Sequence, residues 1–425
     1  MDRINQLRAF LDCSHSAYHA VAELAKMLDG EGYTQLKETE LWTVKAGGKY
    51  YLIRNGSGLV AFRVPEGTPK GFLIAAGHAD RPCFKVKENG VLAGAYTRLA
   101  VERYGGMLIA PWLDRPLSVA GRVLVETATG IQSCLVDIDR DLLLMPNVAI
   151  HMNRTANDGY KWNPAVDSIP LLGDKETKAF WEELESTAGG RILGHDLYLY
   201  VRQNASVWGM DGEFLSAQAL DDLACVWGCT QGFLKAQPTD SIPVLCVFDN
   251  EEVGSSSYQG AASDLLERTL SHICKMLNLE EGCQLAKSFL VSADNAHALH
   301  PNHPELSDSA NAPVVNGGVV VKFNANQRYT TDGVSAAVFR KICEKANVPV
   351  QTYCNRADIT GGSTLGNISL SQVAVPSVDI GLAQLAMHSC YETAGVRDVD
   401  YLVDAMTAYY GTQLEVTADG DIGIR

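Results

Sequence analysis

The sequence predicts an α/β fold, in which a mixed sheet flanked by helices carries an inserted, mainly β domain. Near-continuous apolar runs at 71–77, 242–248 and 289–292 are typical of strands buried in a parallel sheet. From about residue 213 onward, strand-like and helix-like segments alternate. Between about 81 and 208, alternating strands with turn signals dominate instead. Because 425 residues are many for a single core, we expect one domain from residues 1–80 and 209–425 and an inserted assembly domain at 81–208.

Local patterns predict the individual elements in chain order. Apolar residues at helical spacing predict helix within 2–29, which stops at Gly30 and Gly32. Segments 50–53 and 59–62 flank a polar, glycine-containing turn and predict a hairpin. In the insertion, 119–127 and 131–138 are expected strands. Further along, we expect helices at 215–235, 334–345 and 396–414, and strands at 319–323 and 373–380.

Composition narrows the class of protein. Acidic residues (50) exceed Lys plus Arg (35), so the net charge is 35 − 50 = −15, which argues against nucleic acid or an anionic membrane as a partner. The start of the chain lacks the apolar region of a signal peptide, and no apolar run is long enough to span a bilayer. The eleven cysteines form no CxxC pairs. They are expected to be reduced thiols of a cytoplasmic protein, and poor candidates for zinc ligands.

Two adjacent carboxylates, Glu251 and Glu252, follow the buried strand at 242–248. Desolvated and unpaired, they would be costly, and a bound cation would remove that cost. The alternative is a solvated turn at the end of the strand. Successive side chains of an extended backbone point in opposite directions, so a bend is needed to bring both carboxylates to one site. Gly254 would permit that bend.

Other acidic and imidazole residues fall at comparable places. In open α/β sheets, ligands bind outside the carboxyl ends of the strands. The candidates at strand ends or helix starts are His78, Asp221 or Asp222, Glu251 with Glu252, Asp294 and His388. Taken alone, a histidine is usually a packing residue and an aspartate at a helix start is usually an N-cap. Five such positions together predict a metal site.

The donor types indicate the chemistry of this site. Two histidines and three carboxylates suit two zinc or similar divalent ions that share one bridging carboxylate. Such ions activate a water and polarise a carbonyl or phosphoryl oxygen, and the spare glutamate would carry the proton. Asp80 is placed to orient His78 through the second imidazole nitrogen. A two-metal hydrolase is therefore expected, acting on peptides or on phosphoesters. The segment 361–364 lacks the G-x-S-x-G elbow of serine hydrolases, and no dinucleotide fingerprint is present.

At these residues the chain resembles the M18 metallopeptidases, the aspartyl aminopeptidase family. The matching blocks run along nearly the whole chain. They are GHAD (77–80), YGG (104–106), WLDRPLSVAGR (112–122), NVAIH (147–151), LDDL (220–223), NEEVGS (250–255), SADNAHALHP (292–301), GGSTLG (361–366) and QLAMHS (384–389).

The resemblance implies a zinc-exopeptidase-like catalytic domain and a role for each ligand. Asp221 would bridge two divalent ions, Zn²⁺ or alternatively Co²⁺ or Mn²⁺. His78 and Asp294 would complete one site, and Glu252 and His388 the other. Glu251 would be the general base, and the peptide bond after Asp221 is often cis in related enzymes.

The resemblance also implies partners and a substrate. The inserted domain builds dimers that assemble into a tetrahedral dodecamer in relatives, and His151 matches a histidine that enters a neighbouring subunit's active site. His297 and His300 would contact the oxyanion or the substrate, or pack. Relatives remove an N-terminal Asp or Glu, for which Lys322 would be the buried cation. Ala79 and Arg81 depart from the family pattern beside Asp80 and put the acidic preference in doubt. The alternatives are a broader-specificity aminopeptidase or deacylase, and a catalytically idle assembly protein.

Overall fold

The computed structural model describes residues 2–175, 179–418 and 420–425. Among these residues, nine strands form the main sheet, in the spatial order β1-β2-β3-β13-β4-β14-β18-β16-β17. Their bounds are β1 (Thr34–Leu36), β2 (Lys49–Arg54), β3 (Gly58–Arg63), β13 (Ile242–Phe248), β4 (Phe72–His78), β14 (Phe289–Ala293), β18 (Ser377–Gly381), β16 (Val319–Phe323) and β17 (Val350–Cys354).

The sheet contains both parallel and antiparallel pairs of strands, which confirms the predicted mixed sheet. Strand β13 pairs with β4 in parallel register from Ile242 opposite Phe72 to Phe248 opposite His78. Strand β14 is parallel to β4 and to β18, whereas β3 and β16 run antiparallel to their neighbours β13 and β18. The carboxyl ends of β4, β13 and β14 therefore meet at one edge of the sheet.

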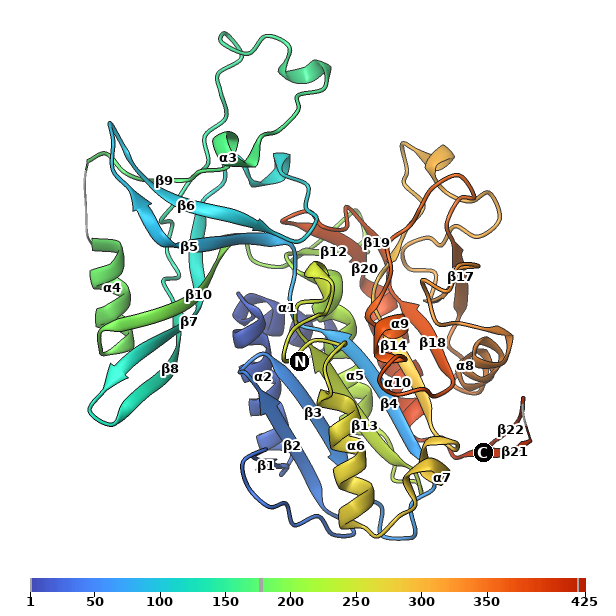
Figure 1. Cartoon of the computed structure of the whole chain (residues 1–425). Coiled ribbons are helices and arrows are strands. Elements are labelled where there is room, and N and C mark those ends of the chain that lie inside the picture. The colour runs from blue at the N-terminus through green and yellow to red at the C-terminus, as the bar shows by residue number, and fades with distance from the viewer. Residues whose placement is uncertain (1, 176–178, 419) are drawn as a thin grey trace.

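Helices cover both faces of the sheet because side chains alternate along each buried strand. Leu59, Leu73 and Leu245 pack into one core, and their neighbours Val60 and Ile74 pack into the other. The first core lies under α1 (Arg3–Cys13), α2 (Ala17–Gly30), α5 (Leu220–Lys235), α8 (Gly333–Lys345) and α10 (Val396–Tyr410). The second lies under α6 (Leu265–Met276), α7 (Glu281–Leu285) and α9 (Leu365–Ser369) (Figure 1).

The predicted insertion forms a separate antiparallel sheet with its own core (Figure 1). In the described part of the chain this sheet has six strands, in the order β8-β7-β10-β5-β6-β9. They are β8 (Gly130–Asp137), β7 (Leu117–Thr127), β10 (Ile192–Val201), β5 (Cys83–Leu92), β6 (Thr97–Tyr104) and β9 (Leu171–Gly173), with helices α3 (Pro164–Asp167) and α4 (Ala179–Ala188) alongside. The mainly β character is confirmed, and the domain limits stay a prediction.

A smaller sheet supports the edge of the main one where the strands end. Among the described residues it contains β11 (Ser206–Trp208), β12 (Phe214–Ala217), β20 (Glu392–Gly395), β19 (Ala383–Leu385) and β15 (Ala296–His297). A hairpin of β21 (Leu414–Ala418) and β22 (Asp421–Ile424) ends the chain. Single 3-10 turns are η1 (Ala110–Trp112), η2 (Ala156–Asp158), η3 (Glu251–Val253) and η4 (Pro304–Leu306).

Several predicted boundaries were wrong. Residues 215–217 belong to β12, which pairs with β20, and the helix starts only at Leu220. Residues 373–376 precede the strand that begins at Ser377, and the last helix ends at Tyr410. The N-terminal helical pattern is divided between α1 and α2, because the Ser16 side chain caps α2 by accepting the backbone N–H of His19.

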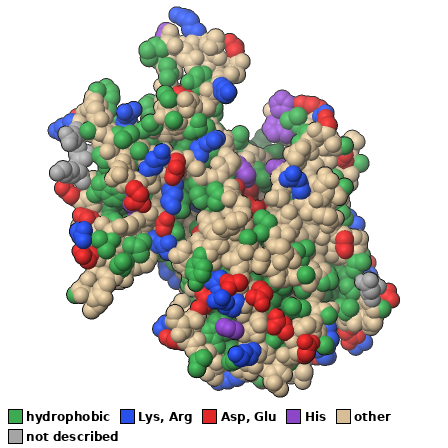
Figure 2. All heavy atoms as spheres, in the orientation of Figure 1, with side chains coloured by type: hydrophobic (Ala, Val, Ile, Leu, Met, Phe, Trp, Pro, Cys, Tyr) green, Lys and Arg blue, Asp and Glu red, His purple; other side chains and the backbone are tan. Residues whose placement is uncertain are grey.

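The surface carries charged side chains of both signs. On the face shown in Figure 2, Lys and Arg side chains are interspersed with Asp and Glu side chains. None of the described helices is long and apolar enough to cross a membrane.

Candidate metal centre

The predicted ligands converge at the carboxyl edge of the main sheet. His78 ends β4, Glu252 follows β13, and Asp294 follows β14. Asp221 lies at the start of α5 and His388 just after β19. Within the described chain, His78, Asp221 and Asp294 form one group whose ligand atoms all lie within 4.8 Å of one another. Asp221, Glu252 and His388 form a second such group.

Asp221 stands between the two groups. Its Oδ1 is 3.6 Å from His78 Nε2, and its Oδ2 is 3.5 Å from His388 Nε2. His388 Nε2 is also 3.4 Å from Glu252 Oε2. The two oxygens of one carboxylate thus face two different histidines, an arrangement suited to bridging two ions. The peptide bond between Asp221 and Asp222 is cis.

The residues fit divalent metal ions. Within the described chain, two buried oxygens of the candidate ligands, Asp221 Oδ1 and Glu252 Oε1, have no hydrogen-bond partner. Buried carboxylate oxygens are rarely left unpaired in folded proteins, and a cation would satisfy them. Imidazole nitrogens and carboxylate oxygens are also ligands that zinc accepts.

Burial and the close packing of carboxylates raise the pKa values of several carboxyl groups in the site. Burial, together with the neighbouring Asp294 and Asp80 carboxylates, raises the pKa of Glu251 to about 8. Burial also raises the pKa of Asp294 to about 6, against the opposing effect of Lys322. Asp221 is the exception: burial would raise its pKa, but the neighbouring imidazoles of His388 and His78 hold it below its ordinary value. The cluster therefore binds protons when no cation is present.

A tight turn aims both glutamates at the site. The backbone of Asn250 has φ of 62°, the 3-10 turn η3 follows, and Gly254 has φ of 97°. The bend expected at Gly254 is present, and Asn250 supplies a second one that the sequence did not reveal. Asn tolerates this left-handed conformation better than most residues because its short side chain can hydrogen-bond locally.

Asp80 holds this turn. Its Oδ1 accepts the backbone N–H of Glu251 at 3.1 Å, and its Oδ2 accepts that of Glu252 at 3.2 Å. His78 Nδ1 lies 3.3 Å from Asp80 Oδ1 and 3.1 Å from the Asp80 backbone carbonyl. Asp80 therefore contacts His78 through its carboxylate and its backbone carbonyl, and also fixes the two glutamates; its predicted role as the residue that orients His78 stays a prediction.

Lys322 is buried behind the centre. Its Nζ donates to the backbone carbonyls of Asp294 at 2.7 Å and Asn295 at 3.2 Å. Its ammonium also lies 5.1 Å from the centroid of the Tyr329 ring. These contacts connect Lys322 to the turn that carries Asp294, and its role in recognising an acidic substrate stays a prediction.

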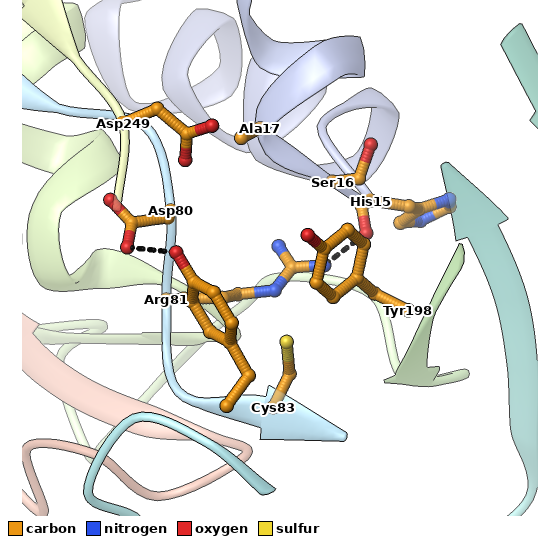
Figure 3. Close-up of a pocket in the computed structure, with 9 residues that line it drawn as sticks. His15, Ser16, Ala17, Asp80, Arg81, Cys83, Tyr198 and Asp249 are labelled. Carbon is orange, nitrogen blue, oxygen red and sulfur yellow. Dashed lines mark hydrogen bonds between the residues drawn. The ribbon is translucent and has the colours of Figure 1, made fainter. Parts of the chain in front are cut away.

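The remaining predicted residues lie outside the two ligand groups. His297 and His300 are exposed and line a pocket that also includes Met387, next to His388. His151 is exposed on the segment between β8 and β9. Arg81 is buried, and its guanidinium donates to the backbone carbonyls of Ser14, at 2.9 Å, and His15. Figure 3 shows the Arg81 side chain extending from beside Asp80 toward His15. Its guanidinium therefore binds backbone carbonyls between α1 and α2.

Sequence reasoning missed Glu392. Its side chain accepts the backbone N–H groups of Asp221 at 3.0 Å and His388 at 2.7 Å, which fixes two candidate ligands at once. Burial, followed by the Asp221 charge, raises its pKa to about 8. A single glutamate in a short strand gives no local signal, because its partners come from distant parts of the chain.

Known proteins share this architecture. The cryo-EM structure of the Ape4 and Nbr1 complex contains a chain with a TM-score of 0.93 and 33% identity, covering 96% of this chain and 85% of that chain. The S. cerevesiae mApe1 dodecamer gives a TM-score of 0.85 at 26% identity, covering 96% of both chains.

Curated relatives match over almost their full length. The probable M18 family aminopeptidase 2 of Clostridium novyi (strain NT) is 41% identical over 424 residues, which cover 96% of this chain and 98% of that protein. Its namesake from Pseudomonas paraeruginosa (strain DSM 24068 / PA7) is 40% identical over 420 residues, covering 95% of this chain and 96% of that protein. Residues 10–410 match the family model for the aminopeptidase I zinc metalloproteases (M18). The chain therefore belongs to the M18 family of zinc aminopeptidases.

Proposed function

We propose that this aminopeptidase uses two zinc ions to remove N-terminal residues, with a preference for Asp and Glu. The observation that carries the proposal is the position of Asp221, whose two oxygens face His78 and His388 separately. His78 and Asp294 would hold one ion with Asp221, and Glu252 and His388 the other. Bound there, the ions would supply an activated water and polarise the scissile carbonyl.

Glu251 is the general base of the proposed reaction. Its carboxylate lies close to two of the proposed ligands, because Glu251, His78 and Glu252 form a third group whose ligand atoms lie within 4.8 Å of one another. Its carboxyl lies among the ligand atoms, where it is placed to accept a proton from the activated water and return it to the leaving amine. Asp80 keeps the Glu251 backbone in place through the hydrogen bond to its N–H group.

The pocket beside the centre supports an acidic preference. His297, His300 and Arg356 line it together with Met387. Arg356 pairs with Asp358 at 2.8 Å, and both side chains are well exposed. Exposed ion pairs contribute little free energy, roughly 0–1 kcal/mol, so a substrate carboxylate can compete for the guanidinium. Lys322, the cation that the resemblance implied, is the alternative to Arg356 for this purpose, and kinetics of Lys322→Met on acidic and apolar substrates distinguish the two.

A broader-specificity aminopeptidase is the second candidate. The same pocket is lined by Leu306, Ile359 and Leu385, which would accept an apolar side chain. Steady-state kinetics on matched peptides with N-terminal Asp, Glu, Leu or Lys decide between the two. A higher kcat/KM for Asp and Glu is expected, and a preference for Leu would refute the acidic assignment. Elemental analysis should give two zinc ions per chain.

We also propose that the chain assembles into a homododecamer built from dimers; the similar mApe1 chain forms a dodecamer. The exposed apolar side chains Val148, Ile150 and Met152 flank His151 and suit a contact between subunits. His151 would then reach the active site of a neighbouring subunit. Sedimentation analysis of the zinc-loaded protein tests the assembly.

A further inference from the structure

The six-stranded sheet reaches the metal centre through Tyr104, the last residue of β6. Its hydroxyl donates a hydrogen bond to Asp80 Oδ2 at 2.7 Å and accepts one from Asn250 Nδ2 at 2.7 Å. Its ring lies edge-on to Tyr198 of β10, with 5.6 Å between the centroids. The ring of Tyr104 thus packs against its own sheet, and its hydroxyl contacts Asp80 and Asn250 beside the turn that carries Glu251 and Glu252.

The two glycines after Tyr104 extend this contact to two candidate ligands. Gly105 has φ of +78°, and a Cβ there would lie 3.1 Å from the Glu252 Cβ. A Cβ at Gly106 would lie 4.0 Å from Nδ1 of the His388 ring. Two residues further on, the Leu108 N–H donates to the His388 carbonyl at 3.1 Å. Glu252 and His388 are the two ligands assigned, with Asp221, to the same ion.

We propose that Tyr104 is a positioning residue, and that residues 104–106 couple the six-stranded sheet to the metal centre. The proposal rests on the roles given above to Glu251, Glu252 and His388. Asp80 Oδ2 accepts two hydrogen bonds, one from the Tyr104 hydroxyl and one from the Glu252 N–H group. Without the tyrosine hydroxyl, Asp80 loses one of its fixed donors and Asn250, at the start of the turn, loses an acceptor. The turn that carries both glutamates then gains freedom to move.

The test is Tyr104→Phe in the zinc-loaded full-length chain, with Tyr198→Phe as the matched control. The control removes a hydroxyl from the same pocket and keeps the hydrogen bond between Tyr104 and Asp80. Substitutions of residues that orient metal ligands typically cost about 10-fold to 100-fold in metal affinity or activity. We expect Tyr104→Phe to lower kcat in that range with KM changed less than about 2-fold. Zinc release from the resting protein to a chelator should also be faster, which is a readout independent of turnover.

A double-mutant cycle shows whether Tyr104 acts through Asp80. In an Asp80→Asn background the Tyr104→Phe substitution should have no further effect on kcat or zinc release, because coupled residues do not give additive effects. Gly105→Ala is an independent second variant and should also speed zinc release, since the added Cβ would press on Glu252.

The outcomes separate this inference from the proposed function. If Glu251→Gln keeps full activity, the proposed function fails, and zinc release alone then decides the role of Tyr104. If Glu251→Gln is inactive while Tyr104→Phe matches Tyr198→Phe in kcat and zinc release, the positioning role is overturned. Additive effects of Tyr104→Phe and Asp80→Asn overturn it as well.

Discussion

The Lys322 ammonium donates a 2.7 Å hydrogen bond to the backbone carbonyl of Asp294 and lies 3.5 Å from Oδ1 of the same residue. The lysine side chain is only 2% exposed. A buried ammonium needs hydrogen-bond acceptors and a counter-charge, and the Asp294 turn provides both. Lys322 is therefore arranged to orient a candidate metal ligand.

This relationship predicts the behaviour of Lys322→Met. Because Asp294 would lose its orienting cation, kcat/KM should fall by about 10-fold to 100-fold for peptides with N-terminal Asp and Leu alike. Kinetics on both substrates, with zinc content, measure the effect. Lys341→Met is the control, since Lys341 pairs with Glu344 on the surface. A loss confined to acidic substrates would contradict this expectation and favour the predicted role in specificity.

The neighbouring glutamates provide a second prediction, because they carry the same charge in different roles. Glu251→Gln should keep both zinc ions and lower kcat by about 10²-fold to 10⁴-fold, the usual contribution of a general base. Glu252→Gln should lose zinc from the site it shares with Asp221 and His388. Elemental analysis and kcat, measured on both variants, separate the roles. Zinc loss in Glu251→Gln with normal zinc in Glu252→Gln would reverse the assignment.

The sequence was most informative where local patterns determine structure. Apolar runs predicted β4, β13 and β14, and the parallel pairing of these strands brings His78, Glu252 and Asp294 to one edge. Residue spacing alone could not show that Asp221, at the start of a helix, and His388, in a loop, lie at the same edge. The topology of the folded chain places them there.

Features that depend on distant partners were not predictable. Residues 215–217 were assigned to a helix, but pairing with β20 makes them a strand. Glu392 and Tyr104 belong to the centre only because the folded chain brings them to Asp221, His388 and Asp80. The charge of Arg81 was visible in the sequence, but its burial against the α1–α2 junction was not.

The raised pKa values predict an unusual pH dependence for the metal-free protein. Burial raises the pKa of Glu251 and of Glu392 to about 8, and those of Asp249 and Asp294 to about 6. Between about pH 4.5 and 8, the folded chain therefore holds protons that the unfolded chain has released. Because the folded state binds more protons, the free energy of unfolding should fall as the pH rises through this range.

Urea denaturation of chelator-treated protein at about pH 5.5, 7 and 8.5 measures this trend. Zinc-loaded protein is the control: its ligands must be deprotonated to bind metal, so its stability should rise with pH over the same range. A metal-free protein that becomes more stable between pH 5.5 and 8.5 would show that these carboxyls are not buried as described.

The proposed role of His151 predicts complementation between subunits. His151→Ala and Glu251→Gln should each be inactive or nearly so when assembled alone. In a co-assembled mixture, a chain with intact Glu251 can receive His151 from a Glu251→Gln neighbour. With equal amounts and random assembly, half of the sites have Glu251 and half of their neighbours supply His151, so about a quarter of wild-type activity should return.

The measurement is kcat after joint dissociation and reassembly, with each variant treated separately as the control. Mixing the assembled variants without dissociation should restore no activity, because each assembly then still contains only one variant. His15→Ala is a matched histidine variant, since His15 pairs with Asp137 within the same chain and cannot be supplied by a neighbour. If the co-assembled mixture stays inactive, His151 acts within its own subunit or not at all. Recovery of activity would instead place part of each active site on the adjoining chain, and would explain why this segment is exposed in the single chain.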